Sequence, residues 1–414
     1  MMQTKMKQLA AALGIVLGLA THQAAMAQTT PGISSDNRIL IGVVAPLSGP
    51  VAYAGRATIE SMRMYIDSVN KEGGVNGRQI RMIAEDDGYD PGKSVAAVRK
   101  LVSVDKVMAI APIIGTAPIL AVREYLNTQK VVAFNGKAAD PFIGNYPYLF
   151  GLGTPYEIQG AIAIEFIAND LNAKKNGDSI YAVVPDDAFG IAQIKGFEPA
   201  AKNMGVKLAV EKVPRNADQY GSVVTNIKRS GAKFVITGSP RASTAALMRE
   251  AEAQNLDVTF VSPNGAVTEA AIFDLAGKKY AERYYGVHSV SQWEDESDPL
   301  IKWARDRFRA EGKTDVLKEK NFFYVWGLIV AKTVVEGMRQ AGPDITREKL
   351  DVALKNLDKY DLGGGIAPVT YKGQRMLIPG TTARVSKGVL VDGVLSLKPA
   401  TPQRAARTVI TLGQ

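Results

Sequence analysis

The stretch IGVVAPLSGPVAYAGR, residues 41–56, is the first part of the chain whose residue types suggest chemistry. An apolar run leads into a loop with Gly49 and Gly55 and then into helical spacing, which is the outline of a phosphate-binding turn. A P-loop needs GxxxxGK followed by Ser or Thr. Here the glycine spacing is one residue longer, and Arg56 and Ala57 follow. GxGxxG, the dinucleotide-binding pattern, is also absent from this turn, so we do not expect a nucleotide site.

Residues that could perform catalysis or bind a metal are scarce. The chain has two histidines and no cysteine. His288 stands alone without a GxSxG nucleophile motif, so we interpret it as structural. Neither a thiolate site nor a histidine cluster can form, which excludes the common zinc sites. The acidic run at 85–87 has no further spaced ligands, so we expect it to be solvated or to cap a helix. We therefore predict a binding protein without cofactor, metal or catalytic activity.

Residues 1–27 have the pattern of a secretory signal peptide. Lys5 and Lys7 precede a short apolar run at 9–20, and small residues end the segment at Ala27. A membrane anchor is the alternative, but the run is shorter than the roughly 20 residues that cross a bilayer. The absence of cysteine also removes the attachment point of a lipid anchor. We predict an exported, soluble protein in the periplasm of a Gram-negative cell.

Length and composition favour a globular protein with two domains. The chain has 414 residues, of which 46% are hydrophobic and 22% charged, and its formal net charge is +9. The basic residues are scattered among acids instead of forming runs with aromatic residues. This distribution is typical of a solvated surface, and we expect no nucleic-acid partner.

Short β-branched runs alternate with helical patterns along most of the chain. Several runs are continuously apolar, as in strands that are buried on both faces of a parallel sheet. The predicted strands are 39–47, 79–87, 107–114, 131–135, 179–186, 206–213, 233–239, 258–263 and 284–290. After residue 290 we expect helices at 297–311, 321–341 and 345–356, followed by strand-like segments. This pattern predicts an α/β protein with doubly wound parallel sheets in two lobes, and a ligand cleft between them.

Three segments resemble the periplasmic solute-binding proteins of branched-chain amino acid type ABC importers, the leucine-binding-protein-like type I family. They are IGVVAPLSGPVAYAG, NKEGGVNGRQIRMIAEDDGYDPGKSVAAVRKLV and PDDAFG, within a match over 36–395. The resemblance implies two Rossmann-like lobes joined by three crossovers, which close on a solute. Lobe one would comprise 36–157 plus 290–362, and lobe two 158–289 plus 363–414. The implied partners are a small solute and the permease subunits of an ABC importer with their ATPases, and the implied state is a monomer.

The resemblance places solute contacts of lobe one in three loops. Gly115 and Thr116 begin a helix whose backbone amides suit a carboxylate. A second loop reads NGKAA, in which Ala138 offers its backbone, Ala139 lacks the hydroxyl usual in the family, and Lys137 either supplies charge or points to solvent. In the third loop a tyrosine is usual where this chain has Ala54, so that ring has either moved to Tyr53 or been lost.

Contacts from lobe two would be Tyr156, Phe189, Arg241 and Asn264. Amino acid binders place acids where this chain has Tyr156 and Asn264, and neither side chain can neutralise an ammonium group. Phe189 would form an aromatic wall. Arg241 would either clamp a carboxylate or lie at the rim, paired with a surface acid such as Glu250.

These residues favour a carboxylate-bearing solute without an ammonium group, such as a small organic or aromatic acid. The alternatives are a branched-chain amino acid, an amide or urea solute, a periplasmic sensor that feeds a receptor, and an exported enzyme on the same scaffold.

Overall fold

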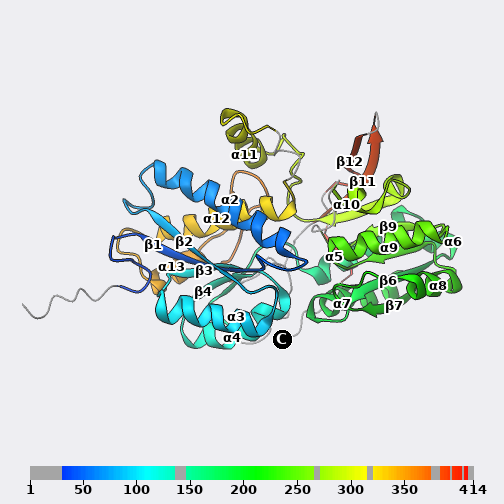
Figure 1. The fold of residues 1–414 in the computed structure, drawn as a ribbon, viewed down its shortest axis with the longest axis horizontal. Helices are drawn as coiled ribbons and strands as arrows, with labels where there is room; N and C mark the ends of the chain where they lie inside the picture. The colour runs from blue at the N-terminus through cyan, green and yellow to red at the C-terminus, as the bar shows by residue number, and fades with distance from the viewer. Residues whose placement is uncertain are drawn as a thin grey trace, which may run out of the picture.

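A computed structural model describes residues 30–135, 146–264, 271–314, 320–373, 383–391, 394–402 and 405–408. Within these residues the strands form two sheets, each covered by helices, in two lobes that lie side by side (Figure 1). The predicted α/β class with two parallel-rich sheets is confirmed. The predicted signal peptide lies outside the described residues. Among the described helices, none is long and apolar enough to cross a membrane.

Lobe one is built on a parallel sheet with the strand order β2-β1-β3-β4-β5. Its strands are β1 (Ile39–Ala45), β2 (Ile80–Asp86), β3 (Ala109–Ile113), β4 (Val132–Asn135) and β5 (Leu149–Gly151). Its helices are α2 (Ala52–Lys71), α3 (Pro91–Arg99) with the π-helical η1 (Lys100–Val104), α4 (Thr116–Thr128), α11 (Pro299–Ala310), α12 (Phe322–Ala341) and α13 (Arg347–Lys355). The chain therefore returns to lobe one for its last three helices.

Alternation along β1 explains the layers of lobe one. Ile41 and Val43 pack in the core under α2 and α12, whereas Leu40 and Val44 pack in the core under α3 and α4. Successive strand residues point to opposite faces, so a continuously apolar strand needs helices on both sides. α12 lies very close to α2 at Gly327. A Cβ added to Gly327 would lie 2.1 Å from Ser61 Oγ.

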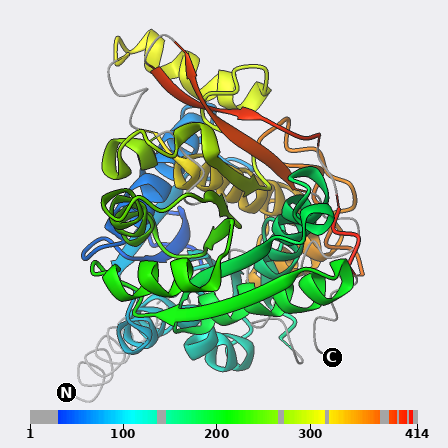
Figure 2. The same cartoon turned by 90° about the vertical axis from the view of Figure 1, so that its right-hand side faces the viewer.

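Lobe two is built on a sheet with the order β12-β11-β10-β9-β8-β6-β7. Its strands are β6 (Ser179–Pro185), β7 (Lys207–Val213), β8 (Phe234–Thr237), β9 (Thr259–Ser262), β10 (Tyr284–His288), β11 (Arg384–Val391) and β12 (Val394–Pro399). Its helices are α5 (Tyr156–Glu165) with η3 (Phe166–Asp170), α6 (Ala173–Asn176), α7 (Ala188–Met204), α8 (Gly221–Ser230), α9 (Arg241–Ala253), α10 (Ala271–Ala276) and η5 (Ala281–Arg283). β11 and β12 pair antiparallel at one edge, as the red ribbons in Figure 2 show.

Connections between the lobes meet beside the cleft. Thr154 N–H, between β5 and α5, donates to Ser289 Oγ after β10 over 3.4 Å. His288 is buried, with Nδ1 2.9 Å from Val290 O and Nε2 2.7 Å from Ser386 Oγ of β11. The side chain that we expected to be structural thus joins two of the connections.

The third connection leaves lobe one later than the boundary at residue 362 that the resemblance implies. Val369 and Tyr371 belong to the core of lobe one, and the Tyr371 hydroxyl donates to Gly151 O over 3.0 Å. Ala383 belongs to the core of lobe two. This packing favours a lobe boundary between Tyr371 and Ala383.

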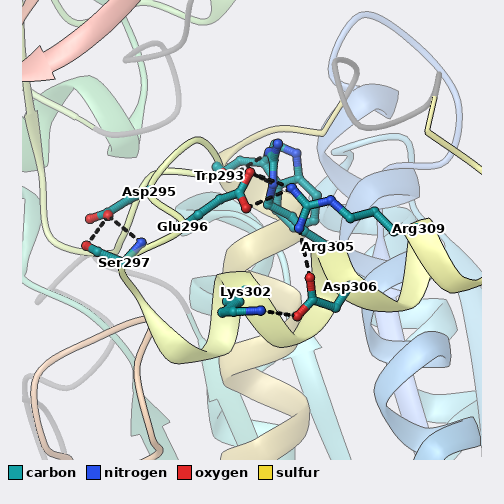
Figure 3. A network of polar contacts seen from close by, with 8 residues as sticks. All are labelled: Trp293, Asp295, Glu296, Ser297, Lys302, Arg305, Asp306 and Arg309. Carbon is teal, nitrogen blue, oxygen red and sulfur yellow. Dashed lines mark hydrogen bonds and ion pairs between the residues drawn. The ribbon is translucent and has the colours of Figure 1, made fainter.

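A network of charged side chains braces the segment that leads from β10 into α11 (Figure 3). Glu296 accepts from Arg309 Nη2 at 2.7 Å and lies 2.9 Å from Arg305 Nε, and Arg309 also pairs with Asp306. Most of these side chains are partly exposed, where ion pairs contribute little to the free energy of unfolding. We therefore interpret the network as fixing the local path of the connection.

Candidate ligand-binding site

A cavity lies between the two lobes at the carboxyl ends of the strands. Its empty space, including the part that opens to solvent, is about 540 Å³. The lining residues come from the loops after β1, β2 and β3, from the loops after β7, β8 and β9, and from the starts of α2, α4, α5, α7 and α12. They are Pro46, Val51, Tyr53, Ala54, Tyr89, Ile114, Gly115, Thr116, Tyr156, Phe189, Arg215, Ser239, Pro240, Asn264 and Phe323.

Most of the residues expected from the sequence lie together in this cavity. Those that line it are Tyr53, Ala54, Gly115, Thr116, Tyr156, Phe189 and Asn264. Arg241 is not part of the lining, and its guanidinium carbon lies 4.2 Å from the centroid of the Tyr53 ring. Lys137, Ala138 and Ala139 lie outside the described residues. The ligand contacts of all these residues stay predictions.

The start of α4 is the part of the lobe-one wall where backbone amides could bind an anion. Gly115 is the N-cap residue, with φ 120° and ψ 145°, and no side chain caps the helix. Other residue types rarely adopt this conformation. A Cβ on Gly115 would also lie 2.7 Å from Cε2 of Tyr89. Glycine is therefore needed here both for the backbone conformation and for the ring that lies against it.

Tyr89 is a lining residue that the sequence reasoning did not single out. It has a left-handed φ of 65° in the loop between β2 and α3. Two acids hold this loop. Asp86 Oδ1 accepts from Leu47 N–H at 2.8 Å and from Gly88 N–H at 2.9 Å, and Asp87 Oδ1 accepts from Tyr89 N–H at 2.9 Å. The acidic run at 85–87 thus braces the loop that carries Tyr89.

Burial is the largest influence on the ionisation of Asp87 and Tyr89 in this loop. Burial raises the pKa of Asp87, and hydrogen bonds from Tyr89 N–H and Ser94 Oγ oppose that increase. Burial also raises the pKa of Tyr89, and the positive charge of Arg215 opposes it. The Tyr89 phenol is therefore neutral at physiological pH.

The first turn of α2 presents Tyr53 and Ala54 to the cavity. The Tyr53 ring packs edge to face on Phe323, with ring centroids 5.7 Å apart and an interplanar angle of 76°. Of the two alternatives left open by the sequence, this placement favours a ring that has moved by one residue.

Arg215 supplies a positive charge in the lobe-two wall, and the sequence reasoning did not find it. Its Nη2 lies 2.5 Å and its Nε 2.6 Å from Asp187 Oδ2. Its guanidinium carbon lies 4.3 Å from the centroid of the Tyr89 ring and 5.3 Å from that of Phe189. Asp187 also caps α7 by accepting from Phe189 N–H at 2.9 Å. The guanidinium group is thus fixed by an ion pair and lies against two aromatic rings.

Tyr156 lies beside this group at the start of α5. Its ring packs edge to face on Phe189, with centroids 4.8 Å apart. Burial is the main reason that its pKa is raised well above the usual value. The Tyr156 hydroxyl is therefore protonated over the physiological pH range.

Several helices begin at the cavity without a side-chain cap. These helices are α2, α4, α5 and α9. Uncapped N-terminal amides carry a partial positive charge and attract anions. Among the described lining residues one side chain is cationic and none is acidic. Asp187, outside the lining, pairs with that cation at 2.5 Å, so the uncapped helix starts are the main feature of the cavity that favours a negatively charged group on the ligand.

Residues 38–388 match the periplasmic binding protein family, and the chain belongs to this family. A curated relative is the leucine-, isoleucine-, valine-, threonine- and alanine-binding protein of Pseudomonas aeruginosa. It is 27% identical over 322 residues, which are 77% of this chain and 82% of the relative.

Two solved structures share the fold. One is a fatty acid ABC transporter substrate-binding protein from Thermomonospora curvata, with a TM-score of 0.80 and 19% identity over 92% of this chain and 95% of that one. The other is a solute-binding protein from R. palustris in complex with 4-hydroxybenzoate, with a TM-score of 0.76 and 18% identity over 90% and 98%. The fold is that of a type I periplasmic binding protein.

Proposed function

We propose that this protein is the periplasmic solute-binding component of an ABC importer and captures a small carboxylate that lacks an ammonium group. The observation that carries the proposal is the composition of the described cavity lining, which contains uncapped helix starts and Arg215, itself paired with Asp187, but no acidic side chain. A buried ammonium group without a carboxylate partner costs several kcal/mol. An α-amino acid therefore gains less from this cavity than the same acid without its amino group.

Aromatic side chains make up much of the remaining lining. They are Tyr53, Tyr89, Tyr156, Phe189 and Phe323. These rings favour a solute whose remaining part is apolar or aromatic, because aromatic side chains bind such groups by stacking and edge-to-face packing. The 4-hydroxybenzoate bound by the R. palustris protein and the fatty acid named for the T. curvata protein are acids of this kind.

The arrangement supports capture by closure of the lobes. Thr116 in lobe one and Arg215 in lobe two both line the cavity, so a solute between them contacts both lobes only in the closed arrangement. Such a solute shifts the equilibrium toward the closed state by the free energy of the extra contacts that it makes there. The permease would then receive the closed, loaded protein, and no chemical step is required.

Matched solutes test the proposal in a thermal-shift assay. Leucine and 4-methylpentanoate differ only in the α-amino group, as do phenylalanine and 3-phenylpropanoate. We expect the two acids without the amino group to raise the melting temperature more than their amino acid partners, because the amino group finds no carboxylate. The amide 4-methylpentanamide serves as the neutral control. Stabilisation by leucine or valine, with none by the organic acids, would refute the proposal.

Branched-chain amino acid binding is the second candidate, because the P. aeruginosa relative is named for it. The same assay separates the two, since that function predicts stabilisation by leucine and none by 4-methylpentanoate. Mass spectrometry of the solute after long incubation tests for an enzyme, for which we expect no change of mass. A pull-down that recovers a receptor instead of permease subunits would favour a sensor.

A further inference from the structure

Two arginine–tyrosine pairs connect the lobes at the cavity. Arg215 and Arg241 come from lobe two, and Tyr89 and Tyr53 come from lobe one. We propose that these pairs are the positioning contacts that hold the lobes closed over the solute, with each tyrosine ring acting through its face. The inference rests on closure as part of the proposed function, but not on the identity of the solute.

The Arg215–Tyr89 pair is preorganised from both sides. In lobe two, Asp187 holds the guanidinium group at 2.5 Å and Phe189 flanks it at 5.3 Å. In lobe one, Asp87 fixes the backbone of Tyr89, and Gly115 leaves room for the ring. Tyr89 also keeps a left-handed φ of 65°, which is unfavourable for a bulky residue and marks a position that the surrounding structure holds in place. Neither partner needs to reorganise when the lobes close.

The Arg241–Tyr53 pair joins the first turns of two helices. Arg241 is the first residue of α9, and Tyr53 lies in the first turn of α2. Phe323 of α12 packs on the Tyr53 ring with centroids 5.7 Å apart, and the guanidinium carbon of Arg241 lies over the Tyr53 ring, 4.2 Å from its centroid. This pair contacts the cavity through Tyr53, whereas Arg241 itself lies outside the lining.

Closure brings each arginine of lobe two onto the face of its tyrosine in lobe one. A guanidinium group on an aromatic face is stabilised more strongly when water is excluded, as it is between closed lobes. Opening separates both pairs at once, because each has one partner in each lobe. Loss of one ring should therefore lower the ratio of closed to open protein about five- to thirtyfold.

A distance measurement between the lobes tests the inference directly. The chain has no cysteine, so two introduced thiols are the only labelling sites. Val104→Cys in lobe one and Leu275→Cys in lobe two place spin labels at side chains that are 72% and 46% exposed. Distance distributions are recorded by double electron–electron resonance without solute, with benzoate and with leucine.

Leucine and phenylalanine variants of each tyrosine separate the contribution of the aromatic ring from that of the hydroxyl group. We expect Tyr89→Leu and Tyr53→Leu each to reduce the short-distance population, and Tyr89→Phe and Tyr53→Phe to restore most of it. Tyr125→Leu is the matched control, because Arg99 stacks on Tyr125 at 5.1 Å within lobe one and that pair does not span the cleft. Its distance distribution should match that of the parent protein.

Two results would overturn the inference: leucine variants that keep the parent short-distance population, or a parent protein without such a population in any of the three conditions. Closure with leucine but not with benzoate would contradict the proposed solute class and leave the two pairs intact as closing contacts. Thermal unfolding of each variant without solute separates a loss of closure from a loss of folding.

Discussion

The two walls of the cavity differ in what they offer a ligand. Lobe one supplies the backbone amides at the start of α4 and the faces of Tyr53 and Tyr89. Lobe two supplies Arg215, with Arg241 beside the cavity, and the ring of Phe189. The tyrosine rings of lobe one contact the arginine side chains of lobe two, and an anionic solute would contact both lobes. The difference teaches that each lobe contributes only part of the cavity lining, so in the proposed function the same residues serve both solute recognition and closure.

The largest expected effect comes from removing the charge of the lobe-two wall. Arg215→Ala should weaken the binding of 3-phenylpropanoate about 10- to 100-fold, the range for a lost hydrogen bond to a charged group. The affinity of the Arg215→Lys variant should lie between that of the parent protein and that of Arg215→Ala, because lysine keeps the charge but loses the planar guanidinium group. Isothermal titration calorimetry measures both.

Lys212→Ala is the control for that variant. Lys212 lies close to Arg215 in the chain but is exposed at the surface, where it pairs with Asp186 at 3.4 Å. Its loss should change the affinity little. Equal losses for the Lys212 and Arg215 variants would show that only the general positive field of lobe two matters.

The lobe-one wall is tested by a single methyl group. Gly115→Ala should lower the free energy of unfolding by about 1–3 kcal/mol through backbone strain and should also weaken solute binding by displacing Tyr89. Gly49→Ala is the matched control, since Gly49 has φ 77° and nothing within 4 Å of an added Cβ. Urea unfolding and calorimetry together separate the effects. A Gly115 variant that loses stability but binds normally would contradict the role given to the Tyr89 ring.

A smaller effect is expected from the Tyr156 hydroxyl. Tyr156→Phe keeps the ring against Phe189 and removes one hydrogen-bonding group that lines the cavity. The affinity for 4-hydroxybenzoate or 3-phenylpropanoate should fall about two- to tenfold, with an unchanged melting temperature without solute. An unchanged affinity for both acids would place the hydroxyl outside the contacts with the solute.

The smallest effect is expected from pH. Burial raises the pKa of both Tyr89 and Tyr156, so these phenols stay neutral up to alkaline pH, while the solute carboxylate stays charged. Affinity for 3-phenylpropanoate should therefore be constant between about pH 7.5 and 9. A fall over this range would indicate a titrating group in the site and would contradict the assignment.

Periodicity and strand ends predicted much of the fold and part of the site. The nine predicted strands each contain a strand of the structure, because continuous apolar runs require burial on both faces. β5 was missed, since the three residues Leu149–Gly151 are too few for a pattern. The family resemblance placed Gly115 and Thr116 at the start of a helix beside the solute, and in the structure both residues line the cavity.

Tyr89 and Arg215 were missed for a physical reason. Both follow strands, after β2 and after β7, so the rule that ligands bind at the carboxyl ends of strands could have drawn attention to them. Their importance depends on a contact between loops of different lobes, and local patterns carry no information about that contact. The packing of Tyr371 on Phe150 likewise joins distant parts of the chain, and it favours an end of lobe one later than the predicted residue 362.

Calorimetric titration with leucine and with 4-methylpentanoate tests the central claim most directly, because the two solutes differ only in the α-amino group. The composition of the cavity predicts that 4-methylpentanoate binds at least about tenfold more tightly than leucine. An unpaired buried ammonium group costs more free energy than a tenfold change in affinity represents. Tighter binding of leucine would contradict the account and would show that this protein supplies a carboxylate to the ammonium group.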